Sequence, residues 1–425
     1  MKDTATSRLA DLVRAEGQGP AAVRAALAEQ MAMAGCAVET LAYLPGEVPM
    51  VDEFAHASVA ADAGETVTIG RLAAAGAGGG GGRSLLLFAH PDTEPHQPDP
   101  GWRSAPFEPT ERNGRLHGWG VADDLAGCAM LSAALLELRA AGLRPAGDVT
   151  LVAAPSKRHR RGIGAALHAG LRADAALYLH PAESGRGLGE IKAFAPGQLE
   201  FALTVEGVPP ETAEPAHTAF AHRGVNPIGK AMAILAALDA LDRDRGERIH
   251  HPRLETAIGR STNLMVTHIA AGEADVTTRL PRTCRLRAAV SLVPDEKLDA
   301  VMGEIEAAVA RAASADPWLA GHPPRIDWLA GVSAAETADT DPFFRTVAGA
   351  IEAAGTTPGV NPLHTSSDIR NPIVQAGIPT LGIGPLCGGL TMAGGVDEWV
   401  DLADYRRSVA VVAAIIADWC GTLRA

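Results

Sequence analysis

Histidine and aspartate residues follow the apolar run Leu85–Phe88 at a spacing that suits metal binding. The run leads through Ala89 to His90 and Asp92. An apolar run of this length predicts a buried strand, and in open α/β sheets ligands gather at the carboxyl ends of the strands. The neutral imidazole of His90 could bind a divalent cation, with Asp92 orienting the ring from behind. The spacing therefore predicts half of a metal site.

A second acidic motif follows a Gly-x-Gly turn and precedes a helical run, Leu125 to Ala141. It consists of Asp123 and Asp124. A carboxylate at the start of such a run is ready to bind a divalent cation. The sequence thus predicts that Asp123 joins His90 as a metal ligand.

The composition narrows the class of protein. The 425 residues, 47% hydrophobic and 20% charged, predict a globular enzyme of two domains. The formal net charge of -13 argues against nucleic acid or an anionic membrane as a partner. The five cysteines are scattered without C-x-x-C spacing, and the first residues lack the apolar centre of a signal peptide. No apolar run approaches the roughly 20 residues of a membrane span, so we expect a cytoplasmic protein.

The elements that must position these residues form three blocks along the chain. Residues 1 to about 40 are predicted to be helical, and from Leu85 strands and helices alternate. The predicted elements are strands at Leu85–Phe88, Val149–Ala154 and Ala175–Leu179, and helices at Gly127–Ala141 and Gly164–Ala169. This alternation predicts an α/β fold with a mostly parallel sheet flanked by helices.

The pattern changes after Gly189 and returns from Asp341. In the middle block the predicted order is strand, helix, two strands, helix and strand, at Gln198–Glu206, Asn226–Leu241, Asn263–Ile269, Cys284–Leu292, Lys297–Ala313 and Arg325–Leu329. That order is typical of an α+β ferredoxin-like domain with two helices on one face of its sheet. The last block is predicted to hold the helix Phe344–Ala354, the strand Thr380–Ile383 and the helix Asp404–Leu423. We therefore expect a metal-binding catalytic domain at 1–191 and 335–425, with an inserted domain at 192–334.

Short motifs in a fixed order continue from Leu85 to the end of the chain. They are His90-x-Asp92, Trp102, Pro106-Phe107, Gly114-x-Leu116-x-Gly118-x-Gly120-x-x-Asp123-Asp124, Gly162-x-Gly164-Ala165, His217, Gly224 with Asn226, Ser367-Asp368-x-Arg370, Gly377-Ile-Pro379, Gly384-Pro385 and Asp397-Glu398-Trp399. In this order they resemble the M20 metallopeptidase and amidohydrolase superfamily, of the aminoacylase and succinyl-diaminopimelate desuccinylase type. The resemblance implies a zinc-exopeptidase-like catalytic domain, a two-metal site and a glutamate general base. It also implies that the inserted domain is a lid that dimerises and lends a histidine to the partner's active site.

Five positions match functional residues of that superfamily. His90 falls on a metal ligand, Asp92 on the residue that orients it, and Asp123 on the carboxylate that bridges two metals. His180, at the end of a predicted strand, falls on a further metal ligand. His217 falls on the lid histidine that contacts the substrate.

Other positions depart from the pattern. The expected Glu-Glu pair, general base and metal ligand, falls on Arg158 and His159, and a late histidine ligand is Gly394. We therefore expect one divalent transition metal per chain, Mn²⁺ or Zn²⁺, rather than two. Arg158 cannot accept a proton, so it is expected to bind an anionic group. His159, Glu183 or Glu94 is expected to replace the missing base.

These assignments predict a metal-dependent hydrolase that cleaves a C–N bond of a small anionic substrate with metal-bound water. Arg158, His217 and His364 are expected to contact that substrate. The favoured reaction is the hydrolytic deamination of an electron-poor aromatic amine such as 5-nitroanthranilate, the chemistry of one atypical branch of the superfamily. One alternative is an N-acyl amino acid amidohydrolase, and another is a catalytically inactive binding protein of the same fold. The lid is expected to make a homodimer or a higher homo-oligomer.

Overall fold

The computed structural model describes residues 4–56, 63–74, 81–99, 101–211, 218–364 and 367–424. The chain divides into two compact units. The first unit holds Met1–Val51, Ala60–Ala195 and Glu336–Ala425, and the second holds Asp52–Val59 and Pro196–Ala335. Along the residues so described, none of the helices combines the length and the hydropathy needed to cross a bilayer.

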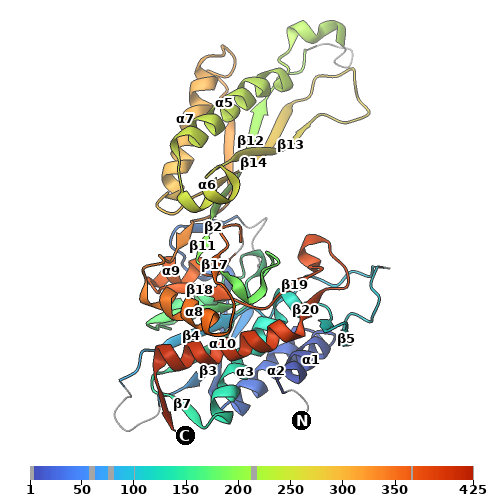
Figure 1. Ribbon diagram of the computed structural model, residues 1–425. Helices are drawn as coiled ribbons and strands as arrows, with labels where there is room; N and C mark the ends of the chain where they lie inside the picture. Colours follow the sequence, from blue (N-terminus) through green and yellow to red (C-terminus); the bar gives the residue numbers. More distant parts are fainter. Residues whose placement is uncertain are drawn as a thin grey trace. The chain divides into compact units, whose positions relative to one another are not determined.

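A six-stranded sheet forms the centre of the first unit (Figure 1). Its order is β1 (Ala37–Tyr43), β3 (Glu65–Leu72), β8 (Val149–Ala153), β4 (Leu85–Ala89), β9 (Ala175–Leu179) and β18 (Thr380–Ile383). The last four strands run parallel to one another, whereas β1 and β3 join antiparallel at one edge. The sheet is thus mostly parallel, and its strands β4 and β9 are central neighbours.

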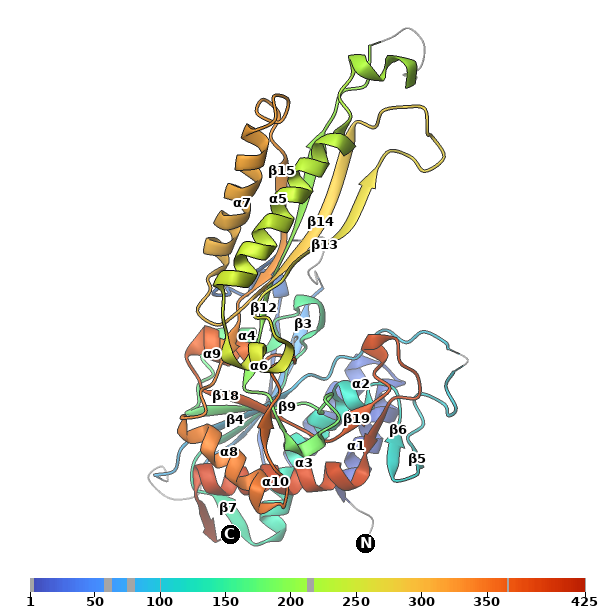
Figure 2. The same cartoon turned by 45° about the horizontal axis from the view of Figure 1, so that its top comes forward.

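Helices cover both faces of this sheet. They are α1 (Thr4–Glu16), α2 (Pro20–Met33), α3 (Ala126–Ala140), α4 (Gly162–His168), α8 (Pro342–Ala353), α9 (Arg370–Ala376) and α10 (Leu402–Cys420). Leu85 and Leu87 of β4 belong to the hydrophobic cluster that contains α3 and α10, which lie side by side in Figures 1 and 2. Leu86 and Phe88 belong to the cluster on the other face, with residues of α4 and α9. Burial on both faces explains why the whole strand is apolar rather than alternating.

Short elements complete the first unit. A four-stranded sheet has the order β19 (Cys387–Gly388), β20 (Trp399–Asp401), β6 (Arg115–His117) and β5 (Thr110–Arg112). Small pairs join β10 (Glu190–Ile191) to β17 (Gly359–Val360), β11 (Phe194–Ala195) to β16 (Ala335–Glu336), and β7 (Leu143–Pro145) to β21 (Thr422–Arg424). A π-type turn, η2 (Val121–Leu125), precedes α3. Further turns are η1 (Pro45–Glu47), η3 (Lys157–His159), η4 (Gly187–Gly189) and η6 (Thr391–Ala393).

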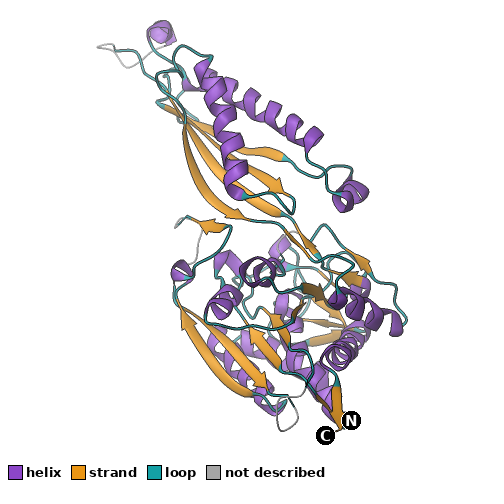
Figure 3. Ribbon diagram, turned by 90° about the vertical axis from the view of Figure 1, so that its left-hand side faces the viewer, coloured by secondary structure: helices purple, strands orange, loops and turns teal. Residues whose placement is uncertain are grey.

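The second unit is an antiparallel sheet with its two long helices on one face (Figure 3). The strand order is β13 (Leu264–Ala271), β14 (Thr283–Leu292), β12 (Gly197–Glu206), β15 (Arg325–Val332) and β2 (Glu53–Ala55). The helices are α5 (Pro227–Arg248), α7 (Leu298–Ser314) and the short α6 (Pro252–Ile258), with the turn η5 (Thr218–Arg223). The predicted insert covers 192–334. Strand β2 adds a segment to this unit that lies far earlier in the sequence.

Two predicted elements differ from the structure. The helix predicted over residues 1 to about 40 is two helices followed by β1, because Gly19, with φ of 98°, and Pro20 separate α1 from α2. The helix predicted to close the chain ends at Cys420, and Thr422–Arg424 continues as β21.

Candidate functional site

Two histidines lie level with each other at the carboxyl ends of adjacent parallel strands. Phe88 of β4 pairs with Tyr178 of β9, so His90 and His180 each follow two residues later on neighbouring strands. Their ring centroids are 5.5 Å apart. Both residues are buried, with 4% relative exposure each. The parallel register therefore brings two imidazoles to one point of the sheet edge.

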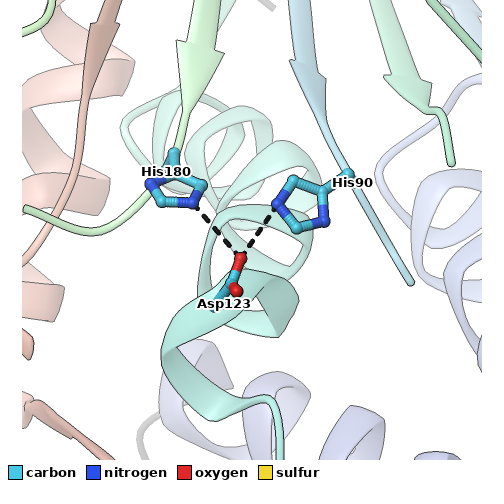
Figure 4. A group of neighbouring side chains, drawn as sticks. All are labelled: His90, Asp123 and His180. Carbon is cyan, nitrogen blue, oxygen red and sulfur yellow. Dashed lines mark hydrogen bonds and ion pairs between the residues drawn. The ribbon is translucent and has the colours of Figure 1, made fainter. Parts of the chain in front are cut away.

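Asp123 joins this pair from the turn η2 before α3 (Figure 4). Its Oδ1 atom lies 3.1 Å from Nε2 of His90 and 3.4 Å from Nε2 of His180. The carboxylate is buried, with 3% of the side chain exposed. The three predicted metal ligands thus lie together in the structure and form a group that could hold a metal ion.

The hydrogen bonds behind the two rings favour a cation between them. Nδ1 of His90 lies 3.1 Å from the carbonyl oxygen of Asp92, and Nδ1 of His180 lies 3.0 Å from that of Pro181. A carbonyl oxygen only accepts, so each Nδ1 carries a proton, and each Nε2 faces Oδ1 of Asp123. A proton on Nε2 bonds to Asp123, and a divalent ion would replace that proton and take the Nε2 lone pair of each neutral ring. Ligand atoms of a tetrahedral zinc are about 3.3 Å apart for bonds of about 2.0–2.1 Å, so this donor set fits a divalent metal.

Charges and hydrogen bonds within the site shift the pKa values of His90 and Asp123. Burial alone would lower the pKa of His90, but its hydrogen bonds to Asp123 and Asp92 outweigh burial and raise that pKa well above 6.5. Burial alone would raise the pKa of Asp123, but the hydrogen bonds from His180 and His90 hold it well below its usual range. Asp123 is therefore ionised, and the two rings face a full negative charge.

The backbone of Asp123 is fixed from the other side. Oε1 of Glu398 accepts hydrogen bonds from the N–H groups of Ala122 and Asp123, at 2.8 and 3.0 Å. The next residue, Asp124, accepts from the N–H of His90 at 3.2 Å, and the Asp123–Asp124 peptide bond is cis. Burial raises the pKa of Glu398 to about 7. Glu398 thus fixes the backbone that carries the Asp123 side chain.

Lys157, which the sequence interpretation passed over, contacts the second oxygen of Asp123. Its Nζ atom lies 2.5 Å from Oδ2 of Asp123 and 3.6 Å from Oε1 of Glu94. Burial alone would lower the pKa of Lys157, but the charge of Asp123 and the hydrogen bond to it raise that pKa. Aligning the Gly162-x-Gly164 motif with the superfamily puts Arg158, and not Lys157, at the position of the expected general base. Counting forward from Ala153, which pairs with Ala89 of β4, would have pointed to Lys157 as the first charged residue after the strand.

The other predicted residues of this loop lie farther out. Arg158 is exposed over 57% of its side chain and pairs with Oε2 of Glu94 at 3.3 Å. Arg158 and His159 have φ of 57° and 56°, in the left-handed region that strains residues other than glycine. His159 is half-buried. In this loop Lys157 contacts Asp123, whereas Arg158 is exposed and pairs with Glu94.

Glu183 and His364 lie on the far side of His180. Nδ1 of His364 donates to Oε2 of Glu183 at 2.7 Å, and Oε1 of Glu183 lies 4.0 Å from Nδ1 of His180. These three residues form a second group that could hold a metal ion. However, Nδ1 of His180 already hydrogen-bonds Pro181, so the group with Asp123 fits an ion better. Nε2 of His364 is buried and has no hydrogen-bond partner among the described residues.

Two predictions concern residues outside this cluster. His217, the predicted lid contact to substrate, lies outside the described residues. Gly394, in place of the late histidine ligand, has a φ of 74° and offers no side chain.

Comparisons with known proteins place the chain in a family. The model of the family described as peptidase family M20/M25/M40 matches residues 86–418. The chain is 24% identical over 358 residues to an N-formyl-4-amino-5-aminomethyl-2-methylpyrimidine deformylase from Halalkalibacterium halodurans, covering 80% of this chain and 79% of that protein. It is 30% identical over 343 residues to a succinyl-diaminopimelate desuccinylase from Methylobacterium radiotolerans, covering 78% and 80%.

Solved structures show the same fold. Aminopeptidase PepT from Bacillus cereus superposes with a TM-score of 0.67 at 19% identity, covering 97% of each chain. A dinuclear metal-binding peptidase of family M20 from Bacillus subtilis superposes with a TM-score of 0.58 at 14% identity, covering 93% of this chain and 91% of that one. The family match and the two relatives identify the chain as a metal-dependent hydrolase. Because the family model matches most of its length, the protein belongs to peptidase family M20/M25/M40.

Proposed function

We propose that this hydrolase removes an acyl group from a small anionic N-acyl compound, with one divalent metal ion held by His90, Asp123 and His180. The convergence of three metal-type ligands on one point, 3.1 and 3.4 Å apart, carries the proposal. The names of the two relatives, a deformylase and a desuccinylase, support acyl removal as the reaction. Mn²⁺ and Zn²⁺ both accept such mixed nitrogen and oxygen ligands.

The side chains around Asp123 have different roles in the proposed reaction. His90, Asp123 and His180 would hold a divalent ion, which would lower the pKa of a water molecule and so supply the nucleophile. Glu94, close to Lys157 and 29% exposed, is the carboxylate that we propose takes the proton from that water. Glu183 is held by His364 at 2.7 Å and lies 4.0 Å from Nδ1 of His180, so its negative charge favours a cation at that ring.

Substrate contacts follow from exposure and charge. More than half of the Arg158 side chain is exposed, so a substrate carboxylate can replace solvent at its guanidinium group. His217 remains a predicted contact from the lid.

A second candidate reaction is the hydrolytic deamination of an electron-poor aromatic amine such as 5-nitroanthranilate. It is favoured by one observation, the basic loop from Lys157 to Arg161 where the resemblance expects two carboxylates. Cations there suit a substrate in which negative charge spreads over a ring and ammonia leaves.

We also propose a cytoplasmic dimer. The five cysteines are all buried and free, which suits a reducing compartment. Strand β13 ends the sheet of the second unit. It exposes Met265 and Ile269, which are 59% and 53% exposed. An apolar edge strand of this kind is a ready surface for a second copy.

A substrate panel tests the reaction. Chelator-stripped protein reloaded with Mn²⁺ or Zn²⁺ is assayed with N-formyl and N-succinyl amines for acyl release, and with 5-nitroanthranilate for ammonia release. Acyl release that requires metal and disappears in His90→Ala, but persists in the exposed control His168→Ala, supports the first candidate. Metal-dependent ammonia release alone supports the second. Turnover that survives both chelation and His90→Ala would rule out the proposed metal site.

A further inference from the structure

Lys157 occupies one side of the carboxylate on which the candidate metal site is built. Oδ1 of Asp123 faces the two histidines, whereas Oδ2 lies 2.5 Å from Nζ of Lys157. The lysine side chain is only 14% exposed and that of Asp123 only 3%. The two oxygens of one carboxylate therefore face two different cationic positions.

Among the described residues, no group of three metal-type ligands includes Oδ2 of Asp123 as the start of a second metal site. A bridging carboxylate in a two-metal site gives one oxygen to each ion, and each ion needs further ligands. Among the residues that the structure describes, the three-ligand groups are His90–Asp123–His180 and His180–Glu183–His364. Glu94 belongs to neither group, and Gly394 has no side chain to offer. A solved M20 peptidase that shares this fold is described as binding two metal ions.

We propose that the ammonium group of Lys157 takes the place of a second metal ion. It supplies a fixed positive charge at Oδ2 of Asp123 and leaves room for a single divalent ion at Oδ1. This inference rests on the proposed function, because it assigns a role within the same site.

Hydrogen bonds from the loop backbone to Asp92 fix the position of Lys157. The carboxylate of Asp92 accepts the backbone N–H groups of Ser156 and Lys157, at 2.9 and 2.8 Å. The same residue meets Nδ1 of His90 through its carbonyl oxygen, at 3.1 Å. One aspartate thus aligns a metal ligand and the ammonium group together. Left-handed φ values at Arg158 and the next residue turn the chain sharply just after Lys157.

The charge has a defined use in hydrolysis. When water adds to the acyl carbon, a C–O bond forms and the carbonyl electron pair moves to its oxygen. The ammonium group of Lys157 hydrogen-bonds this oxyanion and keeps its own proton. The pair then returns, the C–N bond breaks, and the amine leaves with the proton that Glu94 took from the water. The products are a carboxylic acid and an amine, between which one proton passes to give a carboxylate and an ammonium ion, and no other reactant is needed.

Metal affinity distinguishes this role from a merely structural one. Metal content and affinity are measured by elemental analysis and calorimetric titration with Mn²⁺ for wild type, Lys157→Met and Lys157→Arg. We expect one ion per wild-type chain. Lys157→Met should also bind one ion, about tenfold more tightly because a like charge close to the ion is gone. Its kcat should fall about 100-fold or more, with partial recovery in Lys157→Arg, which keeps the charge.

Other outcomes overturn the inference. If Lys157 only held Asp123 in position, Lys157→Met would bind the ion more weakly than wild type. Two ions in the wild-type chain, or an unchanged kcat in Lys157→Met, would also refute it while leaving the proposed hydrolysis standing. A wild-type chain that binds no ion would instead refute the proposed function itself.

Discussion

A buried ion pair beneath His180 gives a sharp prediction about stability. Nζ of Lys192 lies 2.7 Å from Oε1 of Glu190, and both side chains are fully buried. The same ammonium group donates to the carbonyl oxygens of His180 and Pro181, at 3.1 and 3.2 Å. We expect Lys192→Met to destabilise the first unit, because it leaves a buried carboxylate and two carbonyl groups without this donor.

The expected cost can be worked out in two ways. Removing one partner of a buried pair typically costs about 3–5 kcal/mol. Independently, burial alone would raise the pKa of Glu190, but the charge of Lys192 and its hydrogen bond lower it from 4.5 to about 2. At about 1.4 kcal/mol per pKa unit, that difference corresponds to roughly 3 kcal/mol. The second figure is the pH-dependent part of the stability, and it is of the same order as the first.

The sign of the pH dependence follows from the lowered pKa of Glu190. Its contribution is fully present above the unfolded value of 4.5 and is lost as the pH falls toward about 2. Wild-type stability should therefore fall by roughly 3 kcal/mol from this group over that interval. Glu190→Gln, which cannot ionise, should lack this part of the acid-induced loss.

Urea unfolding at pH 7, followed by circular dichroism, measures these free energies. The double variant Glu190→Gln/Lys192→Met should recover at least about 2 kcal/mol relative to Lys192→Met, because no charge is left buried. Arg71→Met, which breaks the exposed pair with Glu39, is the matched control and should change stability by less than about 1 kcal/mol. Equal stability of Lys192→Met and the double variant would refute the reasoning.

Two further predictions concern the second unit. Met265→Asp places a charge on the exposed edge strand β13, so it should convert a dimer to monomers in light scattering, whereas the equally exposed control Met33→Asp should not. A wild-type chain that is already monomeric would contradict this. Asn226 caps α5 by accepting the N–H of Ile228 at 3.0 Å, so Asn226→Ala should cost about 1 kcal/mol in urea unfolding while Asn226→Ser costs little. Equal losses in both variants would show that the cap is not what stabilises the helix.

The predicted fold class is confirmed. It could be predicted because the apolar runs that indicate its central strands are long and buried. The run Leu85–Phe88 lies within β4, and Ala175–Leu179 is β9, since each must be apolar on both faces. Strand β2 escaped prediction because it is three residues long and pairs with a strand far along the chain. No local pattern encodes such a pairing.

Some residues of the candidate site could likewise be predicted from the sequence, and others could not. His90 and His180 could be found from sequence because each directly follows an apolar strand, and adjacent parallel strands place them together. Lys157 could not be found by counting from the glycine motif, because the loop between them takes left-handed turns and sequence distance does not tell which of its side chains faces Asp123. Position after a strand end is a better guide than distance from a later motif.

Each of the three proposed ligands has its own buried support. Asp92 holds Nδ1 of His90, and Glu398 holds the backbone of Asp123. Lys192 binds the carbonyl oxygen of His180. Supports of this kind fix ligand orientation before an ion arrives, and their loss usually weakens metal affinity.

The Oδ2 side of Asp123 is built differently. There Asp92 accepts a hydrogen bond from the backbone N–H of Lys157. The residue that orients a metal ligand therefore also fixes the position of the ammonium group. A lysine placed by chance beside a two-metal site would compete with the second ion, and nothing would need to hold its backbone. The shared use of Asp92 by His90 and Lys157 therefore argues that one ion and one ammonium group form a single functional unit, which Lys157→Met would separate.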